Sequence, residues 1–109
     1  MRGSERKYME QIKGKEQYIY QLERQLDLDD VQDTLTLAIL GAENLHGRAR
    51  VRLDGWWQLD RQRRQCVIDA STAVGQDVAR LFAGFLAQEF GERAFTVQRP
   101  ASTTEVGQR

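Results

Sequence analysis

The chain has 109 residues, of which 40% are hydrophobic and 29% are charged, and its acidic and basic side chains balance to a net charge of zero. This length predicts one small domain, and the charge balance excludes an overall electrostatic attraction to nucleic acid or to an anionic membrane. A single cysteine excludes an intrachain disulfide and a cysteine-based zinc site, and without a long apolar run no membrane span is expected, so a reducing cytoplasm is the expected compartment.

The first twenty residues hold every lysine, tyrosine and methionine of the chain. Within this segment and just after it, apolar and aromatic side chains recur with the seven-residue period of a coiled coil, at Tyr8, Ile12, Ile19, Leu22 and Leu26. We therefore predict an amphipathic helix over residues 1 to 28 whose apolar seam drives oligomerisation. A solitary helix of this length is only marginally stable in water, so it needs a partner surface: a second copy of the chain, the chain's own domain or another protein.

An acidic block follows, formed by Asp27, Asp29, Asp30 and Asp33. Clustered carboxylates suit calcium, but an EF-hand loop also needs a glycine at its sixth position and a glutamate at its twelfth, and neither is present. We predict that the acidic block is a solvated linker that ends the N-terminal helix, and we predict no metal site.

Two segments then alternate between polar and apolar side chains. Residues 34 to 40 and residues 48 to 53 show this pattern, which predicts two strands. Asp54-Gly55 is a preferred dipeptide for a type I′ hairpin turn, and residues 56 to 59 are expected to return as the next strand. These segments predict an antiparallel meander.

The strongest helix signal comes later, where apolar residues recur at three- and four-residue spacing over residues 74 to 90. Ser71 or Thr72 is placed to cap the start of this helix, and Gly91 is placed to form a left-handed cap at its end. The apolar run of residues 65 to 70 before the cap predicts a buried strand.

The predicted fold class is α+β. An N-terminal amphipathic or coiled-coil helix is followed by a small, mostly antiparallel sheet of four to five strands, the last at residues 94 to 98, and one long helix covers the sheet. The chain is expected to divide into an oligomerisation helix (residues 1 to 28), a compact α+β domain (residues 29 to 99) and a disordered tail (residues 100 to 109).

The α+β domain combines guanidinium groups with an aromatic plane. The candidate residues for binding a partner or nucleic acid are Arg48, Arg50, Arg52, Trp57, Arg61, Arg63 and Arg64. Arginine suits phosphate contact and tryptophan suits base stacking, as in proteins that bind single-stranded nucleic acid. Alternatively, these arginines form a solvated strand face or pair with the acidic block.

Ser71 and Thr72 stand between a predicted strand and a predicted helix N-terminus, a position that favours an anion or a phosphorylation site. The alternative for these two residues is a capping cluster. His46 has no convergent partner in the sequence, and Cys66, in an apolar strand, is expected to be an inert core thiol. No catalytic residue and no cofactor are predicted.

Together these features predict a non-enzymatic, cytoplasmic module for protein interaction and regulation. The N-terminal helix, with a face of the sheet, is expected to join two copies as a homodimer, while the α+β domain presents a surface to another protein. The alternative is a nucleic-acid-binding regulator that uses the arginines and tryptophan of residues 48 to 64. A third interpretation is that the chain is a fragment of a longer regulator.

Overall fold

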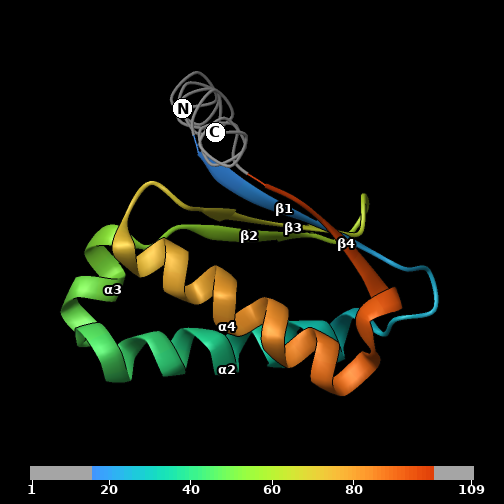
Figure 1. The fold of residues 1–109 in the computed structure, drawn as a ribbon, viewed down its shortest axis with the longest axis horizontal. Coiled ribbons are helices and arrows are strands. Elements are labelled where there is room, and N and C mark those ends of the chain that lie inside the picture. The colour runs from blue at the N-terminus through green and yellow to red at the C-terminus, as the bar shows by residue number, and fades with distance from the viewer. Residues whose placement is uncertain (1–15, 100–109) are drawn as a thin grey trace, which may run out of the picture.

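The computed structural model describes residues 16–99 and shows two layers, a sheet and the helices packed on one of its faces (Figure 1). In chain order the elements are β1 (Gln17–Leu22), α2 (Leu28–His46), α3 (Arg48–Asp54), β2 (Trp57–Asp60), β3 (Gln65–Asp69), α4 (Ala73–Phe90), a short 3-10 helix (Glu92–Ala94) and β4 (Phe95–Gln98). No helix within these residues combines the length and the apolar character that a transmembrane span requires.

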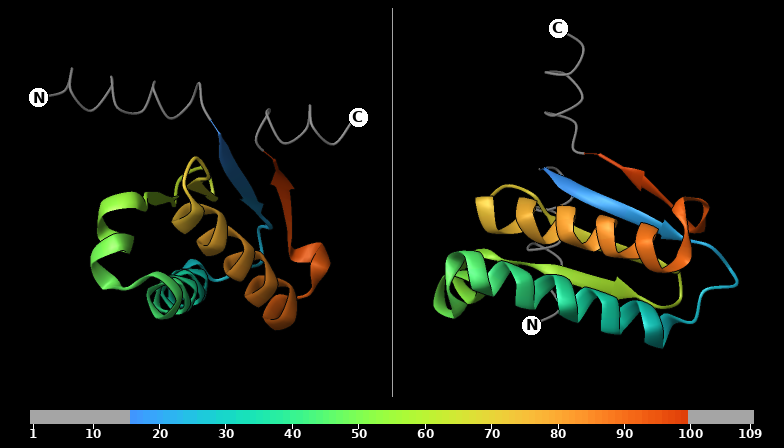
Figure 2. Two further views of the ribbon diagram at one scale, coloured as in Figure 1. Left: turned by 60° about the vertical axis from the view of Figure 1, so that its left-hand side comes forward. Right: turned by 60° about the horizontal axis from the view of Figure 1, so that its bottom comes forward.

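The four strands form one antiparallel sheet in the order β2-β3-β1-β4, so the first strand of the chain lies between two later ones. Apart from the short helix α3 and the 3-10 helix, the succession of strand, helix, strand, strand, helix and strand is the split β-α-β arrangement called ferredoxin-like. Figure 2 shows the two long helices, α2 and α4, on the same side of the sheet. The expected α+β class is therefore confirmed, with four strands and with two long helices over the sheet instead of one.

The core lies between the sheet and these two helices. Its largest fully buried side chains include Tyr20 of β1, Ile68 of β3, Leu35 of α2, and Phe82 and Leu86 of α4. The rings of Tyr20 and Phe82 meet edge to face, with centroids 4.9 Å apart and an interplanar angle of 77°. Side chains return to the same side of a strand every two residues and to the same side of a helix about every 3.6 residues, so these residues all point into the layer between sheet and helices.

The long C-terminal helix forms where its pattern predicts it, as α4. The hydroxyl oxygen of Thr72 accepts a 3.1 Å hydrogen bond from the Gly75 amide and caps the first turn. Gly91 ends the helix with a φ of 95°, in the left-handed region that glycine favours. The strands predicted next to this helix are confirmed as β3 and β4.

The predicted N-terminal helix is wrong where the structure describes it, because residues 17 to 22 form β1. Pairing with β3 on one side and β4 on the other satisfies the backbone of this segment. Leu22 and Leu26, assigned to the apolar seam, are buried in the chain's own core. Tyr8 and Ile12 lie outside the described residues.

The strand predicted over residues 34 to 40 is also wrong, since these residues lie inside α2. Asp27, which was expected to end a helix, begins one, because its carboxylate accepts a 2.8 Å hydrogen bond from the Asp29 amide. The buried positions have helical spacing: Val31, Thr34, Leu35, Ala38 and Ala42. Leu37, inside the predicted strand, lies on the outer side of the helix and is 54% exposed.

The strand predicted over residues 48 to 53 is a helix as well, α3. The predicted type I′ turn at Asp54-Gly55 does not form, because that turn needs positive φ values and Gly55 has a φ of -92°. The hairpin instead joins β2 to β3 through residues 61 to 64, where Arg64 takes a left-handed φ of 54°.

Candidate functional site: the open face of the sheet

The helices cover one face of the sheet and leave the other face without a covering element among residues 16–99 (Figures 1 and 2). Side chains alternate along a strand, and the buried residues of β1 and β3 mark the helix-covered face. The opposite face, here called the open face, carries Gln17, Ile19 and Gln21 of β1, Gln58 and Asp60 of β2, Gln65, Val67 and Asp69 of β3, and Thr96 and Gln98 of β4. Half of these side chains are glutamines.

Two β-branched apolar side chains lie at the centre of the open face. Ile19 pairs directly opposite Val67 on β3 and opposite Gln98 on β4, and Gln58 of β2 pairs opposite Val67. Ile19 and Val67 are both half-buried although no described element covers them. The centre is therefore a small apolar patch bordered by amides.

The amides near the β2–β3 turn hold one another in place. The Gln65 side-chain nitrogen donates a 2.9 Å hydrogen bond to the side-chain oxygen of Gln21. Gln21 in turn donates to the backbone oxygen of Arg63 at 3.1 Å. These bonds fix the position of two open-face glutamines before any partner binds.

Both carboxylates of the open face are engaged by neighbouring groups. Asp69 accepts two 3.0 Å hydrogen bonds from Ser71, one from the amide and one from the hydroxyl. Asp60 accepts a 3.1 Å hydrogen bond from the Arg63 amide. Both carboxylates are the last residues of their strands, so the groups at the centre of this face are neutral.

Of the residues predicted for the oligomer interface, the structure places one, Ile19, on the open face. Sequence periodicity selected it for a helical seam, whereas it belongs to a strand. The remaining open-face residues were not selected, because residues 17, 67 and 98 become neighbours only through strand pairing. The period-two alternation of β1 is the signal that was available for finding them.

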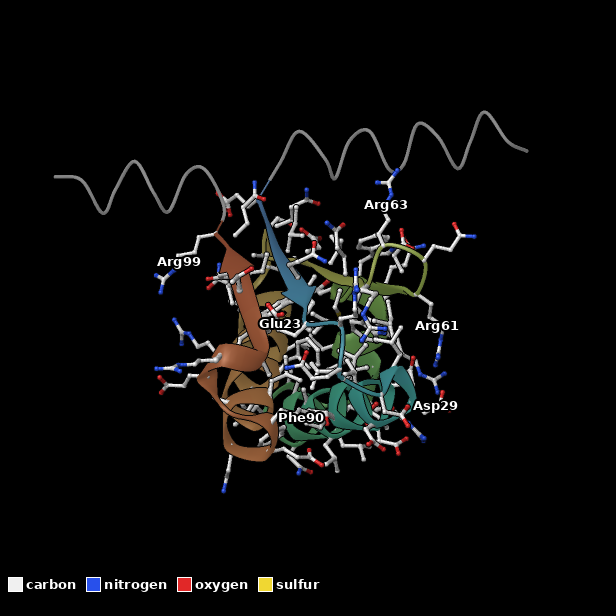
Figure 3. All side chains as sticks on the ribbon, turned by 90° about the vertical axis from the view of Figure 1, so that its right-hand side faces the viewer. Glu23, Asp29, Arg61, Arg63, Phe90 and Arg99 are labelled. Atoms are coloured by element: carbon white, nitrogen blue, oxygen red, sulfur yellow. The ribbon has the colours of Figure 1, made fainter. Side chains whose placement is uncertain are left out.

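The predicted cluster of arginines does not form one patch. Three of them, Arg48, Arg50 and Arg52, lie on α3, which precedes β2. The other three, Arg61, Arg63 and Arg64, lie in the turn between β2 and β3. Figure 3 shows Arg61 and Arg63 on the turn and Asp29 near Arg61. Trp57, included among the candidate binding residues, packs half-buried against the core on the helix-covered face.

Several of these arginines pair with acidic groups. Arg61 meets Asp29 of the acidic block at 3.1 Å, which confirms the pairing alternative for this residue. The pairs Arg50–Asp54 at 3.8 Å and Arg63–Asp60 at 4.0 Å are long and exposed. Exposed ion pairs contribute little to stability, so these arginines remain available to solvent and to partners.

Arg64 has a structural role that its sequence context did not indicate. Its guanidinium donates to the backbone oxygen of Glu23 at 2.8 Å and also to that of Leu26. These bonds join the β2–β3 turn to the loop between β1 and α2. The Nη2 group of Arg64 is thus engaged within the fold, whereas its buried Nε has no hydrogen-bond partner among the described residues.

The open face differs from the nucleic-acid-binding face of RNA-recognition modules, which stack bases on aromatic side chains of a four-stranded sheet. Its central positions are Ile19 and Val67, and none of the open-face side chains defined above is aromatic. Tyr18 and Tyr20 of β1 belong to the opposite, helix-covered face. A base-stacking platform is therefore missing from this surface.

Ser71 and Thr72 form a capping cluster. Besides capping α4, the Thr72 hydroxyl donates a 3.1 Å hydrogen bond to the backbone oxygen of Asp54, and Ser71 is held by Asp69. Both side chains thus have partners within the chain. Anion binding or phosphorylation at this position stays a prediction.

His46 and Cys66 are the remaining residues with potential chemistry. His46 gains a partner that the sequence did not reveal, since its ring nitrogen lies 2.8 Å from the Asp77 carboxylate on α4. Cys66 is fully buried on β3, and burial raises the pKa of its thiol to about 12, so the thiolate is scarce near neutral pH. Within the described part of the chain, no three His, Cys, Asp or Glu side chains gather as a metal site.

This chain matches no known protein family, no curated protein and no solved structure. The ferredoxin-like topology serves many unrelated functions, so the fold by itself does not name one.

Proposed function

We propose that this chain is a non-enzymatic interaction module that self-associates by pairing the open faces of two copies. The observation that carries the proposal is the central pair Ile19 and Val67, bordered by glutamines on a sheet face that no described element covers. Apolar side chains gain free energy when they leave water, and a second sheet face would remove this patch from solvent.

A second copy is the favoured occupant because the open face complements itself. In a two-fold dimer the same surface patch lies against its own copy, so a charged patch would meet like charge. The central side chains of the open face, Ile19 and Val67 with Gln58 and Gln98 beside them, carry no charge. Each glutamine amide carries both donors and an acceptor, so glutamines from two copies can bond to one another.

Domain size supports the same arrangement. A domain of this length buries a modest share of its surface, and association is a common way to bury more. Packing two sheets face to face also covers the backbone and side chains of the central strands.

The test is the mass of the full chain in solution. Light scattering at high micromolar concentration should give twice the monomer mass of 12.6 kDa. An Ile19→Lys variant should be monomeric, because a two-fold interface would bring two buried ammonium groups together. The matched control is Leu40→Lys on α2, where the native leucine is 49% exposed on the helix layer and the dimer should persist.

Two results would overturn the proposal. One is a wild-type monomer across the concentration range. The other is an Ile19→Lys variant that keeps the wild-type circular dichroism spectrum and also keeps the dimer mass.

A further inference from the structure

A cavity of about 370 Å³ opens between α4 and the β1–β4 half of the sheet. Its lining residues come from three elements and from the residue after β4: Tyr18, Tyr20, Ala79, Arg80, Ala83, Val97 and Arg99. Val97 pairs opposite Tyr20 and so belongs to the helix-covered face, yet it is 37% exposed. The helix layer therefore leaves this part of the sheet uncovered.

Small side chains on α4 create the space. Ala79 and Ala83 are four residues apart and so lie on one side of the helix, facing the tyrosines of β1. The Tyr20 hydroxyl donates to the Ala79 backbone oxygen at 2.7 Å, which fixes the helix against the strand at the cavity floor. The floor is thus formed by tyrosine side chains and alanine methyl groups.

The charged groups that line the cavity are both positive. Arg80 projects from α4 with its side chain 76% exposed, and its recorded ion pair with Asp77 is long, at 3.9 Å. Arg99 follows β4, and Figure 3 shows it on the other side of the molecule from Arg61 and Arg63. Burial raises the pKa of Tyr20, and the positive charge of Arg99 acts in the opposite direction.

We propose that this cavity binds a small organic anion, with an apolar or aromatic body on the floor and a carboxylate or phosphate between Arg80 and Arg99. The volume is within the range of sites for small ligands, which are mostly apolar with a few placed polar groups. Guanidinium groups bind carboxylate and phosphate through paired, charge-assisted hydrogen bonds. This inference does not depend on self-association, because the cavity lies on the helix-covered side of the sheet.

The test compares three probes on the full chain: naphthyl phosphate, naphthol and inorganic phosphate. Chemical shifts of the backbone amides report both the affinity and the location of each probe. Naphthyl phosphate should bind at least about tenfold more tightly than either of the other two, because only it offers both the apolar body and the anion. Its largest shifts should occur at Tyr18, Ala83 and Val97.

Two variants separate the cavity from unspecific binding. Arg80→Gln/Arg99→Gln should weaken naphthyl phosphate by about tenfold or more and leave naphthol unchanged. The matched control Arg24→Gln/Arg93→Gln removes two exposed arginines outside the cavity and should bind as wild type does. Ala83→Leu fills the space and should abolish binding of both aromatic probes.

The proposal is overturned if wild type does not bind naphthyl phosphate at millimolar concentration, or if both arginine double variants bind it equally well. Shifts confined to the open face or to α3 would also overturn it. The arginine positions are solvent-exposed and tolerate substitution, so the test remains decisive even if Ala83→Leu does not fold.

Discussion

The hydroxyl of Tyr20 donates a 2.7 Å hydrogen bond to the backbone oxygen of Ala79, across 59 residues of sequence. The bond joins the central strand β1 to the middle of α4, and both residues are buried. The Tyr20 ring also packs edge to face on Phe82, so one side chain holds the helix by a polar and an apolar contact. This residue defines the spacing of the two layers beside the cavity.

Replacing Tyr20 with phenylalanine keeps the ring contact and removes the hydrogen bond. We expect Tyr20→Phe to lower the free energy of unfolding by about 1 kcal/mol, the usual net contribution of a buried hydrogen bond. Urea unfolding followed by circular dichroism measures it. Tyr18→Phe, at a half-buried position on the same strand, is the control and should change stability less. Equal effects in the two variants would contradict the structural role given to the Tyr20 hydroxyl.

Two glycines of α4 should respond to alanine with opposite signs. A Cβ at Gly75 would lie 1.7 Å from the backbone oxygen of Asp69, so the first turn of the helix would have to leave the end of β3. Gly75→Ala should therefore destabilise the fold by about 3 kcal/mol or more. A Cβ at Gly84 meets nothing within 4 Å, and Gly84→Ala should stabilise by about 0.5–1 kcal/mol through helix propensity. Thermal unfolding of the two variants measures both changes in stability. Two changes of the same sign would contradict the surroundings described for these glycines.

Removal of the Arg64 side chain should cost more than removal of its neighbour. Arg64→Ala leaves the backbone oxygens of Glu23 and Leu26 without their guanidinium donor, and we expect a loss of about 2–3 kcal/mol. Arg63→Ala, in the same turn, removes an exposed side chain with a long ion pair and should change stability by about 0.5 kcal/mol or less. Denaturant midpoints for both variants provide the comparison, and similar midpoints would rule out the anchoring role of Arg64.

The Cys66 thiol should make the fold sensitive to alkali. Burial raises its pKa from the ordinary 9.0 to about 12 in the folded chain. Above pH 9.0 the unfolded chain therefore loses a proton that the folded chain keeps, and stability falls as pH rises toward 12. The contribution of the thiol should approach a slope of about 1.4 kcal/mol per pH unit.

Cys66→Ala removes that contribution, so its free energy of unfolding should fall less steeply with pH than that of wild type. The two slopes are compared, because the smaller side chain lowers stability at every pH. A Cys66→Ala variant with the wild-type slope would show that the thiol does not titrate as its burial requires.

The predictable parts of the fold are those in which local signals agree with tertiary packing. The helix α4 has a side-chain cap at Thr72, a left-handed cap at Gly91 and apolar residues in helical periodicity, so each local feature indicates the same element. The strand β3 before it contains a short apolar run, and β4 after it alternates apolar and polar side chains. These three elements were predicted within a few residues of their bounds.

The errors come from segments that satisfy two periodicities. Residues 34 to 40 alternate like a strand, but the cap at Asp27 and the buried spacing from Val31 to Ala42 belong to a helix that begins earlier. Residues 17 to 22 satisfy a heptad and also alternate, and pairing with β3 and β4 selects the strand. Periodicity alone cannot choose, because the deciding contacts are distant in sequence.

The candidate sites depend on such contacts even more strongly. Ile19 meets Val67 only through antiparallel pairing, and Arg80 approaches the same cavity as Arg99 only because α4 crosses β1 and β4. The sequence pointed to arginines that are neighbours along the chain, and the fold places those arginines at two separate ends of β2.

The position of β1 between β3 and β4 also determines how the chain reaches its native state. Of the four described strands, β1 is synthesised first and its two partners last, since Ile19 pairs with Val67 and with Gln98. Contacts so distant in sequence slow folding. A nascent chain that stops before Phe95 leaves one edge of β1 without its β4 partner. An unpaired strand edge is a template for aggregation, so this edge of β1 is protected only after β4 has paired with it.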